Sequence, residues 1–380
     1  MSINLKVFPY TDSEELVENE DELNAALSNE SVYPMNYIKV EKGFYTVFEL
    51  KRKFDSKDKK IILDSDFQRE EVWKPIQKSE LIESILMGLP LPIFYFNEDK
   101  KGRLIVIDGR QRLTALFEYL DNEFSLGKLK ILPELSGKKF DNLDAITQSK
   151  IEDYQIQAHV IQPPTPDRIK FDIFDRVNRA GTQLNKQEIR NALYQGNSTK
   201  LLKSISKSKE FLSATNSTFQ KNSRMKDRYI ILRYLAFYLY FDRRLLDDGA
   251  LYEYKNDIDD LLGRTMEYLN NCDENEIKDI EDKTIICLKN AYYYLGENGF
   301  RLIRNGKKSP INMNVFECLM YLMSKLSIEN SNIKNIVKFA VDEMLKNPEF
   351  LDSIGNHRDS WAKIKTRFEM ADYIAKGILK

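Results

Sequence analysis

The sequence predicts an α+β protein in which a small mixed-sheet domain is followed by an all-α helical domain. Strand-like and helix-like patterns alternate up to about residue 161, whereas beyond residue 196 the strand signals fade and helical periodicity dominates. Prolines at positions 163, 164 and 166 separate the two patterns. We therefore expect an acidic leader over residues 1–35, an α/β domain over residues 36–165 and an α-helical domain over residues 166–380.

The elements of the α/β domain are predicted from local signals. Pro75 suits the first position of a helix, and the apolar residues Leu81, Ile82 and Ile85 give that helix a buried face. Gly88 is expected to end it. The domain should contain, in order, a helix over 46–56, a strand over 61–63, the helix from Pro75, and strands over 93–96, 103–107 and 154–161.

The second domain is predicted from helix caps and helical spacing. Thr165 is expected to cap one helix, and Asn185 with Glu188 forms a capping-box pattern at the start of the next. The stretch Gly299–Gly306 lacks the glycine spacing and the context of a phosphate-binding loop, so we expect a plain loop. Further helices are predicted over 228–241, 250–270, 276–295, 312–326, 333–346 and 359–377.

The junction around Gly109 carries the clearest chemical signal in the chain. Leu104–Ile107 is apolar and β-branched, as in a buried strand, and leucines and a phenylalanine at helical spacing follow from Leu113. The positive end of a helix accepts phosphate well, and Arg110 and Arg112 would add bidentate donors. From these residues alone the alternative is open: Asp108 can simply cap the helix, and the arginines can be solvated or paired with nearby acids.

A family resemblance extends this interpretation. Ile107–Arg112 (IDGRQR) resembles the DGQQR motif of the ParB/sulfiredoxin-like domain in the S subunit of GmrSD-type restriction systems. Three further segments resemble other motifs of that family in the expected order, and together they span about residues 36–195: Asp66–Arg69 with Trp73, Leu81–Pro92, and Phe174–Leu184 with Glu188. Arg110 departs from the family, which usually has Gln there.

The resemblance implies a nucleotide site with Mg²⁺. Asp108, Arg110, Gln111 and Arg112 are the candidate catalytic residues, and Asp108 is also the candidate magnesium ligand. For several candidates a structural role remains open, because Arg69 can pair with an adjacent acid, Asn178 can build a turn, and Trp73 favours the core or a cleft wall. The candidate nucleotide-binding residues are Gly109, Gln68, Arg69, Asn178 and Arg179.

Composition excludes several other classes of protein. The chain has only two histidines, which argues against hydrolysis that depends on histidine. His159 is expected to be a packed or hydrogen-bonded core residue, and His357 is expected to lie in a loop. Nothing in residues 200–380 resembles the His-Asn-His nuclease domain of larger relatives, so the chain is expected to be a stand-alone member. Three scattered cysteines favour a reduced cytoplasmic setting without disulfides or zinc, and neither a signal sequence nor a membrane span is expected.

A net charge of -1 means that any binding of DNA must come from a local patch. The strongest such patch is a basic stretch within residues 200–233, although such a stretch is more often a solvated helix face than a surface that binds DNA. The candidate DNA-binding residues are Lys221, Arg224, Lys226 and Arg228.

Three functions compete at this point. The resemblance implies an Mg²⁺-dependent nucleoside-triphosphate hydrolase, or a nucleotide-gated nuclease, in bacterial anti-phage defence. DNA and a separate nuclease or effector protein are then the expected partners, no membrane is involved, and a homo-oligomer remains open. The alternative is a non-enzymatic nucleotide- or DNA-binding module that recruits an effector. The third is a toxin-like or structural adaptor with a vestigial motif.

Overall fold

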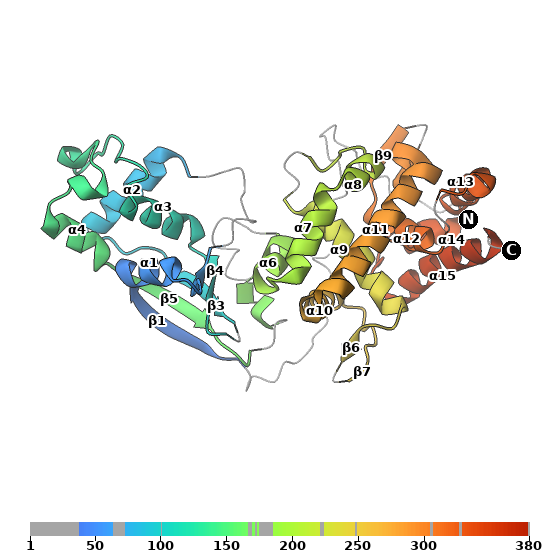
Figure 1. Ribbon diagram of the computed structural model, residues 1–380, viewed down its shortest axis with the longest axis horizontal. Helices are drawn as coiled ribbons and strands as arrows, with labels where there is room; N and C mark the ends of the chain where they lie inside the picture. Colours follow the sequence, from blue (N-terminus) through green and yellow to red (C-terminus); the bar gives the residue numbers. More distant parts are fainter. Residues whose placement is uncertain are drawn as a thin grey trace, which may run out of the picture. The chain divides into compact units, whose positions relative to one another are not determined.

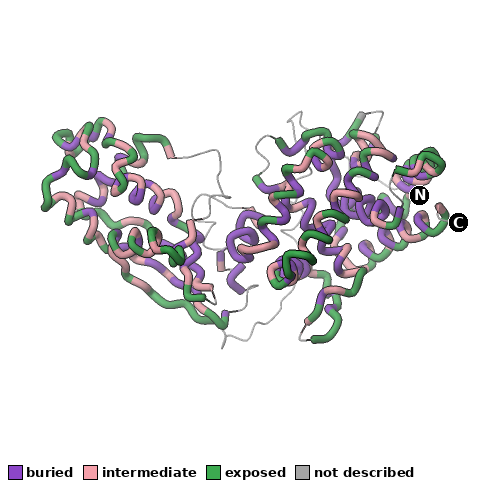
Figure 2. Tube along the Cα trace, viewed as in Figure 1, coloured by how far each residue is buried: buried purple, intermediate pink, exposed green. Residues whose placement is uncertain are grey.

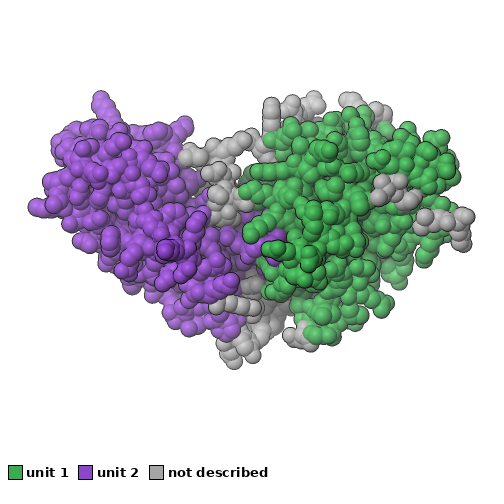
Figure 3. All heavy atoms as spheres, viewed as in Figure 1, with its two compact units in different colours: residues 1–30, 200–380 green, residues 31–199 purple. Residues whose placement is uncertain are grey.

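The fold class predicted from the sequence is confirmed. The computed structural model describes residues 38–63, 73–99, 101–165, 169–171, 173–174, 185–220, 224–247, 249–304, 307–326 and 329–378. The described chain divides after Thr199 into two compact units, here called the α/β unit and the helical unit (Figure 3). The acidic leader lies outside the described residues.

The α/β unit is built on a mixed five-stranded sheet with the strand order β1-β5-β3-β4-β2. The β1/β5 and β3/β4 pairs are antiparallel, whereas β5/β3 and β4/β2 are parallel. The strands are β1 (Val40–Thr46), β2 (Ile61–Ile62), β3 (Phe94–Glu98), β4 (Leu104–Asp108) and β5 (Gln155–Ile161).

One face of this sheet shares a core with four helices (Figure 1). Alternate residues of the central strands, among them Phe96, Val106 and Ala158, point into this core, as the two-residue period of a strand requires. Trp73 is partly buried and packs against the same core, which agrees with the structural role favoured for it. The helices are α1 (Val47–Asp55), α2 (Pro75–Leu86), α3 (Arg110–Leu120) and α4 (Ala145–Glu152).

The helical unit surrounds one buried helix. Every residue of α12 from Met313 to Met323 is buried (Figure 2). Helices α9, α11 and α15 pack against it. The helices from the unit boundary onward are α7 (Asn197–Lys207), α8 (Lys209–Ala214), α9 (Lys226–Phe241), α10 (Ile258–Asn271), α11 (Glu274–Leu295), α12 (Met313–Ser324), α13 (Lys334–Met344), α14 (Pro348–Ser353) and α15 (Trp361–Ile378).

A charged network lies inside this helical core. The carboxylate of Glu317 in α12 accepts hydrogen bonds from Arg233 Nε in α9, at 2.7 Å, and from Arg367 Nη2 in α15, at 2.6 Å. All three side chains are fully buried. Arg233 Nη2 also donates to Asp359 at 2.7 Å. One carboxylate therefore joins three helices that are distant in sequence.

Some expectations about the helical unit were wrong in detail. The stretch expected to be a loop contributes to a hairpin of β8 (Arg301–Arg304) and β9 (Lys307–Ile311), preceded by the short helix η6 (Gly296–Asn298). Residues 250–251 belong to a second hairpin, β6 (Leu246–Asp247) and β7 (Ala250–Leu251), rather than to a helix. No helix among the described residues has the length and apolar character that crossing a bilayer requires.

Candidate functional site

The turn from β4 into α3 depends on Gly109. Its φ of 95° lies in the left-handed region, which side chains with a Cβ rarely adopt. A Cβ at this position would also lie 2.1 Å from Cδ1 of Phe94. Backbone conformation and packing therefore both favour glycine, and the turn brings the start of α3 close against the first residue of β3.

Arg112 is anchored beneath this turn. Its side chain is largely buried and donates from Nη2 to Asp108 Oδ2 at 2.9 Å and from Nη1 to the Pro92 carbonyl. Its guanidinium carbon lies 4.1 Å from the centroid of the Phe94 ring, a cation–π contact. Burial lowers the pKa of Arg112, although the charge of Asp108 acts in the opposite direction. These contacts place Arg112 to position Asp108; a direct contact with phosphate stays a prediction.

Asp108 presents a carboxylate at the carboxyl end of β4. Its side chain is 50% exposed, and only Oδ2 is engaged by Arg112. Oδ1 accepts no hydrogen bond from any residue that the structure describes. One oxygen is thus held in place by a buried cation, while the other accepts no hydrogen bond from the described residues, an arrangement that suits a cation or a water at the second oxygen.

The first turn of α3 lies beside this carboxylate. The positive end of the helix dipole falls there, and the N-cap residue Gly109 has no side chain that could accept from the first N–H groups. Arg110 and Gln111 are half-buried, and neither is without an interaction partner. The motif therefore gathers a carboxylate and a helix N-terminus with an added positive charge within one turn.

A bulge between β3 and β4 pairs Tyr95 with Asp108. Phe96 pairs with Val106, but the preceding Tyr95 pairs with Asp108, so β4 has one extra residue. Bulges commonly redirect a side chain beside an active site. Tyr95 also pairs with His159 of β5, and the centroids of the two rings lie 5.4 Å apart.

Sequence reasoning did not place Tyr95 beside the motif, nor His159 beside Tyr95. Tyr95 was not singled out, and His159 was expected in the core, whereas its ring makes no hydrogen bond to any described residue and is only half-buried. The signal was present in the strand period: Ala158 and Val160 face the core, so His159 between them must face away.

The other face of β4 is contacted by helix α6 (Lys186–Leu193). Its capping box is confirmed: Asn185 Oδ1 accepts from Glu188 N at 2.9 Å, and Glu188 Oε2 accepts from Asn185 N at 2.6 Å. The helix is unusually polar for a buried element, since Gln187, Arg190 and Asn191 are each at most 3% exposed. Sequence reasoning did not single out these three, because buried polar residues look like a solvated helix face without the tertiary partner.

Several predicted residues lie outside the described part of the chain: Gln68, Arg69, Asn178, Arg179 and Lys221. Of the remaining basic residues, Arg224 is exposed and Lys226 is half-buried, whereas Arg228 is only 8% exposed. Arg224 and Lys226 therefore remain the better placed for a DNA phosphate, and the contact itself stays a prediction. No cluster of three or more His, Cys, Asp or Glu residues suited to a metal occurs among the described residues.

The fold and the turn together define an α+β domain in which a carboxylate lies beside the N-terminus of a helix. A helix N-terminus is a type of site that can accept an anion. Residues 50–195 match the family model described as "GmrSD restriction endonuclease, N-terminal domain". This segment is therefore a domain of that family, and it marks the protein as a component of a restriction-type defence system. Comparisons with curated proteins and with solved structures found no match.

Proposed function

We propose that the α/β unit binds a nucleoside triphosphate with Mg²⁺ at the Asp108–Arg112 turn and hydrolyses it to gate an attack on DNA. The observation that carries the proposal is the half-exposed carboxylate of Asp108, fixed by buried Arg112 at the N-terminal end of α3. Phosphoryl transfer requires mainly positioning and neutralisation of charge, and these residue types supply both.

Each residue of the motif has a proposed role. The helix N-terminus and Arg110 would face the phosphate oxygens, Gln111 would orient the attacking water, and Arg112 would hold Asp108 in place. Oδ1 of Asp108, which accepts no hydrogen bond from the described residues, would suit an Mg²⁺ ion, which often takes one carboxylate and completes its shell with water and phosphate oxygens. When bound, the ion would neutralise charge on the phosphates.

A second function is favoured by one observation. The described residues contain no cluster of carboxylates for metal-assisted hydrolysis, so the same site can serve as a nucleotide sensor that recruits a nuclease or effector without turnover. In that function binding of nucleotide would change the affinity for the partner.

Phosphate release from each of the four nucleoside triphosphates, with Mg²⁺ and with or without DNA, tests the proposal. Asp108→Asn should lower release by about a hundredfold. Arg110→Ala should weaken nucleotide binding by about ten- to a hundredfold. Asp121→Asn is the matched control, because Asp121 lies at the opposite end of α3 and pairs with Lys51. Tight Mg²⁺-dependent binding without release would favour the sensor, and equal activity of Asp108→Asn and Asp121→Asn would refute the site.

A further inference from the structure

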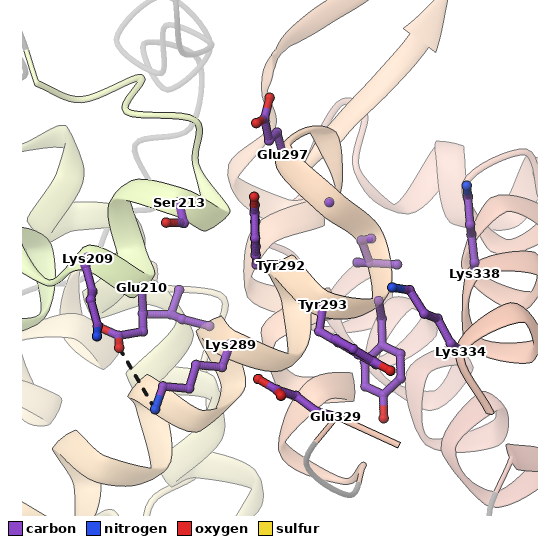
Figure 4. A pocket seen from close by; sticks show the side chains of 14 residues that line it. Lys209, Glu210, Ser213, Lys289, Tyr292, Tyr293, Glu297, Glu329, Lys334 and Lys338 are labelled. Carbon is purple, nitrogen blue, oxygen red and sulfur yellow. Dashed lines mark ion pairs between the residues drawn. The ribbon is translucent and has the colours of Figure 1, made fainter. Parts of the chain in front are cut away.

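The helical unit contains an open hollow of about 640 Å³ that the proposed nucleotide site does not use (Figure 4). It is formed by α8, the C-terminal end of α11, η6 and the start of α13. Its volume falls within the range of ligand-binding sites in proteins, roughly 300–1,000 Å³. Four lysines and three tyrosines contribute to its lining. This combination of cations and aromatic rings is the feature that needs an explanation.

The lysines are exposed and mostly lack acidic partners. Lys209 and Lys338 form no ion pair with any described residue, and Lys334 instead lies 4.2 Å from the centroid of the Tyr293 ring. Lys289 approaches Glu210 only to 4.0 Å, which is a weak contact in an exposed setting. Four ammonium groups that face one hollow therefore repel one another and favour an anionic ligand.

Tyr292 stands between the two groups of lysines (Figure 4). Its residue exposure is 45%, which is high for a tyrosine, and its ring makes no contact with another ring among the described residues. In Figure 4, Lys209 and Lys289 lie on one side of Tyr292, and Lys334 and Lys338 lie on the other. An aromatic ring flanked on both sides by cations suits a ligand that carries a flat base between two phosphates.

We infer that this hollow binds single-stranded nucleic acid, with one base stacked on Tyr292 and the phosphates on either side facing the two pairs of lysines. Stacking platforms combined with basic grooves are the usual means of binding single strands. A free mononucleotide carries phosphate on one side of its base only and would leave one lysine pair without a partner. Glu297 and Glu329 face the same hollow, so the affinity should be modest and dependent on salt.

Fluorescence anisotropy with a labelled oligothymidylate, measured without nucleoside triphosphate, tests the inference. Tyr292→Ala should weaken binding by at least about fivefold. The matched control is Tyr373→Ala, because Tyr373 is 80% exposed on α15 of the same unit and outside the hollow. The logarithm of affinity should fall against the logarithm of salt with a slope of about -2, as expected for about three phosphate contacts to a single strand.

Removing a positive charge and removing a negative charge from the hollow should change the affinity for the oligonucleotide in opposite directions. Lys334→Gln with Lys338→Gln should weaken binding, whereas Glu297→Gln should tighten it by removing repulsion of the phosphates. The control for the lysine pair is Lys278→Gln with Lys283→Gln, which changes the net charge equally in the half of α11 away from the hollow.

Three results would overturn the inference. The first is a Tyr292→Ala protein that binds the oligonucleotide as tightly as the unchanged protein, and the second is an equal loss of affinity in the two lysine double variants. The third is a mononucleotide or an acidic peptide that displaces the labelled strand as effectively as an unlabelled strand does. The outcome is separate from the nucleotide proposal, since Asp108→Asn should bind the oligonucleotide normally and Tyr292→Ala should keep its phosphate release.

Discussion

At the scale of single residues, the sequence alone could not distinguish the residues of the motif that are buried from those that remain exposed. Asp108, Arg110 and Arg112 all looked like candidate ligands for phosphate in the sequence. In the structure Arg112 is buried against Phe94 and holds Asp108, whereas Asp108 itself remains half exposed. The order of residues predicts a candidate site at this turn, but only packing against β3 shows that Arg112 supports Asp108 while Asp108 stays half exposed.

Gly109→Ala should destabilise the α/β unit by about 2–4 kcal/mol, because alanine meets both an unfavourable backbone conformation and the ring of Phe94. Gly88→Ala is the control: Gly88 also has a positive φ, of 70°, but nothing lies within 4 Å of its Cβ position. Urea unfolding, followed by circular dichroism, measures the free energy of unfolding of both variants. A cost for Gly109→Ala no larger than that for Gly88→Ala would show that the contact with Phe94 is unimportant.

At the scale of elements, the sequence predicted best where one element carries its own signal. The turns and apolar faces of α2, β4 and α3 lie within a few residues of the predicted bounds, because proline, glycine and helical spacing specify them locally. Strand β1 was not predicted: three of its first four residues are polar or glycine, and its partner β5 lies more than a hundred residues later. The hairpins β6–β7 and β8–β9 were missed for the same reason, since a strand pair is specified by its partner.

Glu317→Gln should destabilise the helical unit by about 3–5 kcal/mol, because it leaves Arg233 and Arg367 buried without their shared carboxylate. Removing the carboxylate of Glu343 by Glu343→Gln is the control, since its pair with Lys346 is exposed and should contribute less than about 1 kcal/mol. Thermal unfolding measures the two variants side by side. Similar melting temperatures for both would mean that the buried network contributes little net stability.

At the scale of the whole molecule, the order of a mixed-sheet region followed by a helical region was predicted, since strand patterns give way to helical ones along the chain. The exact arrangement of the motif's surroundings was not predictable. Tyr95 pairs with Asp108, His159 pairs with Tyr95, and α6 contacts β4. Such neighbours depend on tertiary contacts that no local pattern specifies.

All three cysteines lie in the helical unit and are buried. Burial raises the pKa of each thiol, that of Cys287 to about 11, so little thiolate is present at neutral pH. A thiol reagent at pH 8 should therefore leave the folded protein unlabelled. Labelling should begin at the urea concentration where the fluorescence of Trp361 changes, measured in a Trp73→Phe variant. Fast labelling of the native protein would contradict the burial of these side chains.

The shared carboxylate of Glu317 has a consequence for biosynthesis. Its two guanidinium partners belong to α9, which precedes α12 in the sequence, and to α15, which follows it. During translation the middle of the unit would leave the ribosome with only one of these cations available, and charge balance inside the core would be completed when the final helix emerges. A nascent chain stalled before that helix should therefore remain sensitive to protease, because Glu317 would be buried with only one of its two arginine partners.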